Sequence, residues 1–173
     1  MGYQKILVAL DRSSQSDAIF ENALLTAKQN NAALMLFYCL PVVEPGMTPY
    51  SNLYGEELIN FSQSLHAKLE KDTDEARQWL SEYCQKATEQ GVPTEWDYKV
   101  GEAGRLICEV AHTWEADLII IGRRGLRGFT EMFLGSVSNY VIHHSRCSVL
   151  VVQGTKELGI MNYELGITPP KNN

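Results

Sequence analysis

A glycine-rich segment at residues 117–138 has the residue types and spacing of a phosphate-binding loop. It begins with an apolar, β-branched run at residues 118–121 and ends where an amphipathic run starts at Val137. Between them lie four glycines, and three of these with a serine form the pattern, namely Gly122, Gly125, Gly135 and Ser136. Glycine lets the backbone approach an anion closely, and the free N–H groups at a helix start point toward negative charge. We therefore expect a buried strand, a phosphate-binding loop and a helix, in that order.

Three arginines lie in the same loop, although the chain has a formal net charge of −6. They are Arg123, Arg124 and Arg127. The glycine spacing does not specify any of them, so a role at phosphates follows from their charge alone. The alternative is that these glycines only form turns. A lone pair of glycines would favour that alternative. Three glycines followed by Ser136 favour phosphate binding.

The turn after the first predicted strand is acidic and contains no glycine. Residues 11–17, DRSSQSD, do not match the GxGxxG dinucleotide signature, and no GxxxxGK(S/T) P-loop occurs in the chain. Asp11 is a candidate ligand for a ribose or a metal ion. It could instead cap the following helix, a role that Ser13 or Ser14 can also fill.

Alternating predicted strands and helices indicate a single-domain α/β fold. Apolar runs ended by turn residues predict strands at residues 5–10, 32–40, 94–100, 118–121 and 148–152. Apolar residues at helical spacing predict helices at residues 15–30, from Leu58 to Ala87, after Gly101–Gly104 and from Val137. This order calls for a mostly parallel sheet with helices on both faces. Polar and apolar residues alternate along the predicted strand at residues 94–100, which predicts that this strand lies near an edge of the sheet.

We expect residues 1–153 to form the domain, with an irregular loop insertion at residues 41–55 and a tail at residues 154–173. In open α/β sheets the ligand binds beyond the carboxyl ends of the strands, where the strand order reverses. If the first and fourth strands are neighbours, Asp11 and the Gly122 loop meet at that point.

Composition limits the classes of partner. The 173 residues are 45% hydrophobic and 21% charged, which is typical of one globular domain. The negative net charge argues against nucleic acid, and no apolar run approaches the roughly 18 residues that span a membrane. The first residues show no signal-peptide pattern, so we expect a cytoplasmic protein. The four cysteines form no CxxC pair and are expected to be reduced thiols.

The glycine pattern, taken with its flanking strands, resembles a known family. Gly122-x2-Gly125-x9-Gly135-Ser136 is similar to the G-2x-G-9x-G-S/T signature of ATP-binding universal stress proteins. The opening ILVALDRSS and the closing CSVLVV resemble that family's first strand and turn and its last strand, so the resemblance covers roughly residues 5–153. It implies an open five-stranded parallel sheet of order 3-2-1-4-5, which is Rossmann-like and similar to the adenine nucleotide alpha hydrolases.

The resemblance also implies which residues meet the adenosine part of a nucleotide. Asp11 stands where the family's acidic residue contacts the ribose or a phosphate-bound metal ion, Mg²⁺ or Mn²⁺. Ala9 and Leu10 would line the nucleotide beside it. Cys39, at the end of the second strand, would contact adenine through its backbone.

The remaining implied contacts are to ribose and phosphates. Three residues of the loop approach them, namely Gly122, Arg124 and Gly125. Backbone N–H groups and hydroxyls come from the start of the next helix, at Gly135, Ser136, Val137 and Ser138.

The resemblance implies a homodimer and a regulatory role. The dimer would form through the last strand, at Val149, Leu150, Val151 and Val152. Because no obvious general base lies beside the phosphate loop, we expect a regulatory module of the stress response that binds ATP, or else ADP or AMP, with at most slow ATP hydrolysis. One alternative is a nucleotide-independent, dimeric interaction protein of the same fold. Another is an adenylate-forming or phosphoryl-transfer enzyme, which would need glycines in the first turn.

Overall fold

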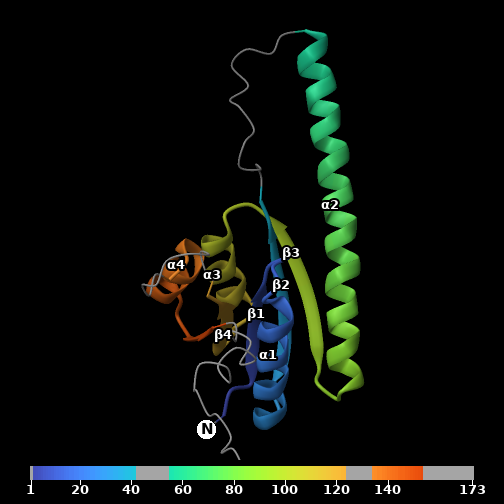
Figure 1. Ribbon diagram of the computed structural model, residues 1–173. Helices are drawn as coiled ribbons and strands as arrows, with labels where there is room; N and C mark the ends of the chain where they lie inside the picture. Colours follow the sequence, from blue (N-terminus) through green and yellow to red (C-terminus); the bar gives the residue numbers. More distant parts are fainter. Residues whose placement is uncertain (1, 42–54, 124–133, 154–173) are drawn as a thin grey trace, which may run out of the picture.

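Five parallel strands form one sheet of order β3-β2-β1-β4-β5 (Figure 1). The computed structural model describes residues 2–41, 55–123 and 134–153. The strands are β1 (Lys5–Leu10), β2 (Ala33–Leu40), β3 (Thr94–Val100), β4 (Leu118–Gly122) and β5 (Ser148–Val152). The order confirms the predicted 3-2-1-4-5 arrangement, with β3 at one edge. Strands β1 and β4 are neighbours, with Ala9 in register with Ile121, so the strand order reverses between them.

The central strands are apolar because helices cover both faces of the sheet. Alternate residues of β1 show this directly. Ile6 and Val8 belong to one buried cluster, whereas Leu7 and Ala9 belong to the cluster on the opposite face. A polar residue at any of these positions would lose its hydration on folding, which explains the uninterrupted apolar runs in the sequence.

Two helices pack on each face (Figure 1). The first cluster contains residues of α1 (Ser16–Asn30) and α2 (Glu56–Glu89), and the second contains residues of α3 (Ala103–Thr113) and α4 (Ser136–His144). Gly104 lets α3 approach α4 closely, because a Cβ added there would lie 2.8 Å from the Tyr140 ring. None of the described helices is long and apolar enough to cross a lipid bilayer.

Three elements start one residue away from the predicted position. Helix α1 begins at Ser16 because Ser13 and Asp11 form hydrogen-bonded turns before it. Strand β2 begins at Ala33, since the N–H of Ala32 still bonds the last turn of α1. Helix α4 begins at Ser136, directly after the predicted phosphate-binding loop.

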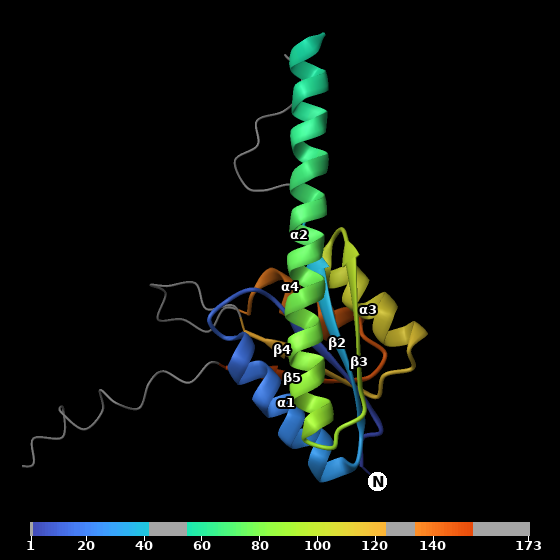
Figure 2. The same ribbon diagram turned by 90° about the vertical axis from the view of Figure 1, so that its right-hand side faces the viewer.

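Helix α2 extends well beyond the sheet, which the sequence did not predict. The predicted apolar face runs along most of the helix, yet the residues that it buries all lie in its second half, at Ala76, Leu80, Tyr83 and Ala87. Figure 2 shows the first half of α2 standing clear of the strands and of the other helices. Residues 42–54, which form most of the predicted loop insertion, and the predicted tail from residue 154 lie outside the described residues.

Candidate functional site

A cavity of about 590 Å³ lies at the carboxyl ends of the strands. Its walls come from the end of β1 and the turn after it, the end of β2, the β3–α3 turn, the end of β4 and the start of α4. This is the place where an open α/β sheet binds its ligands, and the volume suits a small molecule.

The predicted site residues converge on this cavity. It is lined by Ala9, Leu10, Asp11, Cys39, Gly122, Gly135, Ser136, Val137 and Ser138. Two other predicted residues, Arg124 and Gly125, lie outside the described part of the chain. The parallel pairing of β1 with β4 brings the acidic first turn and the start of α4 into one cavity, although more than a hundred residues separate them.

Asp11 is held in place by the backbone of the turn after β1. One of its carboxylate oxygens, Oδ1, accepts a 3.1 Å hydrogen bond from the N–H of Ser13, and its carbonyl oxygen accepts one from the hydroxyl of Ser16. The N-cap residue of α1 is Gln15, and it makes no side-chain capping bond. Asp11 therefore organises the turn rather than capping the helix, and its half-buried carboxylate lines the cavity.

The start of α4 points its free N–H groups at the cavity. The first four N–H groups of a helix have no partner within the helix, and the N-cap residue, Gly135, has no side chain to cap them. The hydroxyl of Ser138 donates a 3.0 Å hydrogen bond to the carbonyl oxygen of Gly122, which ties α4 to the end of β4. These donors and the positive end of the helix dipole make this wall suited to an anion.

Gly135 does not need to be glycine for conformational reasons. Its φ of −59° and ψ of 154° are accessible to any residue. Gly135 lines the cavity, so this part of the wall carries no side chain.

The thiol of Cys39 points to the β3–α3 turn. Its Sγ lies 3.1 Å from the carbonyl oxygen of Gly101, to which it donates. Burial raises the pKa of this thiol above its ordinary value, so the thiol is neutral at physiological pH. The residue thus offers its backbone and a neutral sulfur to the cavity, rather than a nucleophilic thiolate.

A charged rim at the mouth of the cavity was missed by the sequence analysis. Nη1 of Arg12 lies 2.8 Å from Oε2 of Glu75, in the middle of α2. The hydrogen bond from Arg12 lowers the pKa of Glu75 below its ordinary value. Beside this pair Tyr38, which lines the cavity, packs edge-on against Trp79 with ring centroids 5.5 Å apart.

The β3–α3 turn was also missed as part of the site. Gly101 and Ala103 line the cavity because β3 runs parallel to its neighbours and ends at the same edge of the sheet. Their position directly after a predicted parallel strand was a signal that could have placed them here. The same signal applies to Arg12 in the turn after β1, but no local pattern indicates its contact with Glu75, which is 63 residues away in the sequence.

The described lining of the cavity contains one carboxylate, that of Asp11, in addition to a helix start that suits an anion. Mg²⁺ binds proteins through one or two carboxylates while phosphate oxygens fill other positions, and Asp11 can supply such a carboxylate. Within residues 2–41, 55–123 and 134–153, no three His, Cys, Asp or Glu side chains gather as a metal site of their own.

Comparison with known proteins decides the family. The family model described as the universal stress protein family matches residues 2–153. The chain belongs to the universal stress protein family. It is 51% identical over 153 residues to universal stress protein Sll1388 of Synechocystis, a match that covers 88% of this chain and 99% of the relative. It is 33% identical to universal stress protein YxiE of Bacillus subtilis, over 87% of this chain and 99% of the relative.

Solved universal stress proteins share the fold. UspA from Lactobacillus plantarum superposes with a TM-score of 0.70 at 23% identity, over 88% of this chain and 99% of that one. A universal stress protein solved in complex with cAMP gives a TM-score of 0.62 at 24% identity, over 90% of this chain and all of that one (100%). The protein from Archaeoglobus fulgidus in complex with dAMP gives 0.58 at 23% identity, covering 87% and 98%.

Proposed function

We propose that this universal stress protein binds an adenine nucleotide, ATP, in the cavity between the ends of β1 and β4 and acts as a regulatory module of a stress response. The observation that carries the proposal is the convergence of the α4 start, the Asp11 turn and the end of β2 on one cavity. The solved relatives with cAMP and dAMP support an adenine nucleotide as the class of ligand.

The phosphates would lie against the start of α4. Their negative charge would be stabilised by the N–H groups and hydroxyls of the first turn, at Gly135, Ser136, Val137 and Ser138. Gly122 lies at the end of β4, and the hydrogen bond from Ser138 to its carbonyl oxygen holds this wall in position. The loop residues Arg124 and Gly125 are proposed to close over the phosphates.

The adenosine part would extend from β1 toward β2. Asp11 would hold the ribose or a Mg²⁺ or Mn²⁺ ion bridged by the phosphates, next to Ala9 and Leu10. Cys39 would meet the adenine through its backbone, which agrees with a thiol occupied by the Gly101 carbonyl oxygen. The bound cation would neutralise phosphate charge, which matters in a chain whose net charge is −6.

We propose a binding module with at most slow ATP hydrolysis. Efficient hydrolysis requires a group that positions or deprotonates the attacking water within hydrogen-bond reach. Among the described residues that line the cavity, Asp11 is the only carboxylate, and it already accepts a hydrogen bond from the turn. Occupancy of the site can signal without turnover.

A homodimer through β5 in the cytoplasm completes the proposal. Strand β5 is an edge strand and presents Val149, Leu150 and Val151, of which Leu150 is 41% exposed. An apolar edge strand favours pairing with another chain, and a second copy related by a two-fold axis would satisfy it.

The deciding experiment is to denature the purified protein and identify the released small molecules by mass spectrometry. We expect stoichiometric ATP or ADP, and their ratio will show whether hydrolysis occurs. Added ATP and Mg²⁺ should also raise the melting temperature, because a ligand that binds only the folded state stabilises it. An empty protein without that gain would instead favour a nucleotide-independent dimeric interaction protein.

A further inference from the structure

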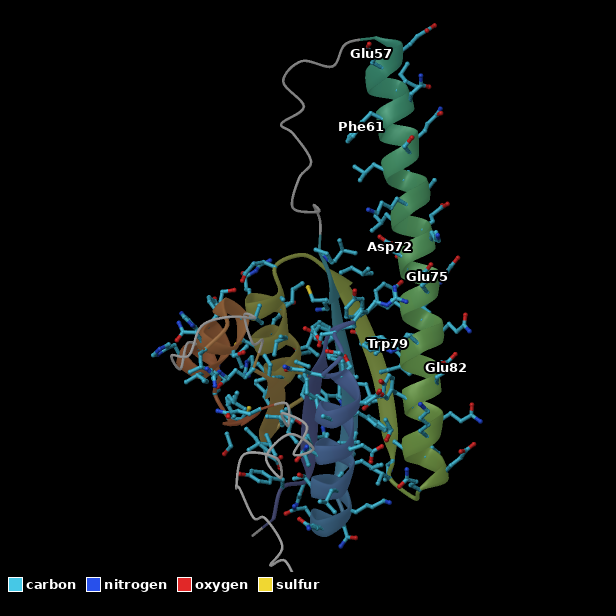
Figure 3. All side chains as sticks on the ribbon, in the orientation of Figure 1. Glu57, Phe61, Asp72, Glu75, Trp79 and Glu82 are labelled. Atoms are coloured by element: carbon cyan, nitrogen blue, oxygen red, sulfur yellow. The ribbon has the colours of Figure 1, made fainter. Side chains whose placement is uncertain are left out.

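Helix α2 contacts the lining of the cavity at two successive turns. Oε2 of Glu75 accepts a 2.8 Å hydrogen bond from Nη1 of Arg12, in the turn after β1. One turn later, the ring of Trp79 packs edge-on against that of Tyr38, near the end of β2, with centroids 5.5 Å apart. Arg12 and Tyr38 both line the cavity. Figure 3 shows Trp79 on the side of α2 that faces the strands. A short stretch of α2 therefore touches two walls of the cavity.

The two contacts act on each other. Burial raises the pKa of the Tyr38 phenol, and the positive charge of Arg12 opposes this rise. The guanidinium therefore lies close enough for its charge to reach the phenol as well as Glu75. A ligand that displaces Arg12 would change the surroundings of Tyr38 at the same time.

The part of α2 that follows this stretch is fixed in the domain. It belongs to the first buried cluster, and the ring of Tyr83 lies 4.7 Å from that of Phe20 in α1 and 5.3 Å from that of Trp79. Close-packed side chains of this kind do not shift gradually under a weak force. A change at Arg12 is therefore expected to alter the turn around Glu75 rather than to move the whole helix.

Glu75 has a second cation within reach. Nζ of Lys71, one turn earlier in α2, lies 3.8 Å from Oε1 of Glu75, while Arg12 bonds Oε2. All three side chains are substantially exposed, so neither ion pair is strong and an exchange between them costs little. Glu75 therefore keeps a partner when Arg12 turns toward an anion.

We propose that occupancy of the cavity is transmitted to helix α2 through Arg12 and Tyr38. The inference rests on the proposed function, because it takes an adenine nucleotide as the anion that draws Arg12 away from Glu75. Coupling of this kind is reciprocal: if Glu75 weakens nucleotide binding by holding Arg12, the nucleotide weakens the contact between Arg12 and Glu75 by the same factor. The filled state then carries on α2 a carboxylate that the empty state holds against the domain, and regulatory switches use such local changes of charge.

A cycle of charge variants in the full chain tests whether Arg12 carries this coupling. By itself, Glu75→Gln should tighten the binding of ATP with Mg²⁺ about two- to fivefold, because it releases the guanidinium. In an Arg12→Gln background the same change should leave the affinity unaltered, since no guanidinium remains to be released. Isothermal titration calorimetry measures the four affinities. Equal gains in the two backgrounds overturn the proposal.

The fluorescence of Trp79 tests whether the change reaches α2. The chain has three tryptophans, and Trp114 lies at the opposite end of the sheet, where its Nε1 donates a hydrogen bond to Glu95 near the start of β3. Saturating ATP should change the emission of the parent and of the matched control Trp114→Phe equally. Trp79→Phe, which keeps an aromatic ring beside Tyr38, should lose most of that change. A change that survives in Trp79→Phe, or a parent that binds ATP without any change, overturns the proposal.

Failure of this inference can be distinguished from failure of the proposed function. A parent that binds no ATP in calorimetry overturns both. A parent that binds ATP, with equal gains from Glu75→Gln in both backgrounds and unchanged emission of Trp79, overturns the transmission to α2 alone and leaves nucleotide binding in place.

Discussion

Arg12 and Glu75 join the turn after β1 to the middle of α2. Nη1 of Arg12 donates a 2.8 Å hydrogen bond to Oε2 of Glu75 across 63 residues of sequence. Both side chains are 42% exposed, so solvent screens the pair and it contributes little to stability. Arg12 also lines the cavity, where the proposed anionic ligand would compete with Glu75 for the guanidinium.

Glu75→Gln should strengthen ATP binding. Neutralising Glu75 leaves Arg12 to the ligand, so we expect about two- to fivefold tighter binding at low salt and a smaller gain at high salt. Isothermal titration calorimetry measures this change in ATP affinity. Glu82→Gln, on the same helix and with the same change in net charge, is the control and should leave the affinity unchanged. An equal gain in both variants would indicate a general charge effect instead.

Gly135→Val should prevent nucleotide binding without unfolding the protein. The backbone angles of Gly135 suit any residue, whereas the added side chain occupies the space proposed for a phosphate. Circular dichroism should stay unchanged while titration with ATP shows at least about a hundredfold loss, corresponding to about 3 kcal/mol. Gly135→Ala, with a smaller side chain, should fall between. Unchanged affinity in the valine variant would exclude phosphate binding at this wall.

Asp11→Ala should weaken ATP binding most when divalent metal is present. The Asp11 carboxylate is proposed to contact a phosphate-bound cation. The difference in ATP affinity between Asp11→Ala and the parent should therefore disappear when EDTA removes the metal. Asp11→Asn is the matched control, because its amide oxygen can still accept the hydrogen bond from the N–H of Ser13 while the charge is removed. If both variants lose the same affinity with and without metal, Asp11 serves the ribose rather than a cation.

Gly122→Ala should destabilise the fold through Ile19. A Cβ on Gly122 would overlap Cδ1 of Ile19 and lie 3.2 Å from its Cγ1, in a well-packed region. We expect the free energy of unfolding to fall by about 1–3 kcal/mol in urea denaturation. Ile19→Val removes Cδ1 and alone costs about 0.5–1.5 kcal/mol, so the double variant should lose less than the sum of the two. Additive losses would show that the overlap is relieved elsewhere.

Stability should decrease as the pH rises above neutral. Burial raises the pKa of four thiols and two phenols in the folded state, namely Cys39, Cys84, Cys108, Cys147, Tyr38 and Tyr83. The folded state therefore keeps protons that the unfolded state releases, so this stabilisation is complete below the unfolded thiol pKa of about 8.5 and is lost above it. Urea midpoints at about pH 7, 8.5 and 10 measure the loss. Replacing all four cysteines by alanine should move the loss of stability to higher pH, toward the tyrosine range near pH 10. A urea midpoint of the parent that stays constant up to pH 10 would contradict the prediction.

Most of the fold was predictable, because a strand that helices cover on both faces must consist almost entirely of apolar residues. The bounds of β1, β3 and β5 match the predicted runs, since each run ends where a turn residue or a polar residue begins. Much of the cavity was predictable too, because glycine spacing and a resemblance to a family both refer to local backbone. The resemblance predicts Ser138 as a site residue, and in the structure its hydroxyl bonds the carbonyl oxygen of Gly122.

The sequence by itself determined the strands, their parallel class and the residues that could hold a phosphate, because burial and backbone freedom leave local patterns. Only the tertiary structure decided which part of an apolar face is buried and which distant residues come into contact. Helix α2 carries one apolar face along most of its length, but the sheet covers only the half from Ala76 onward. Arg12 and Glu75 meet because the domain packs them together, and no local pattern records a contact between residues so distant in the chain.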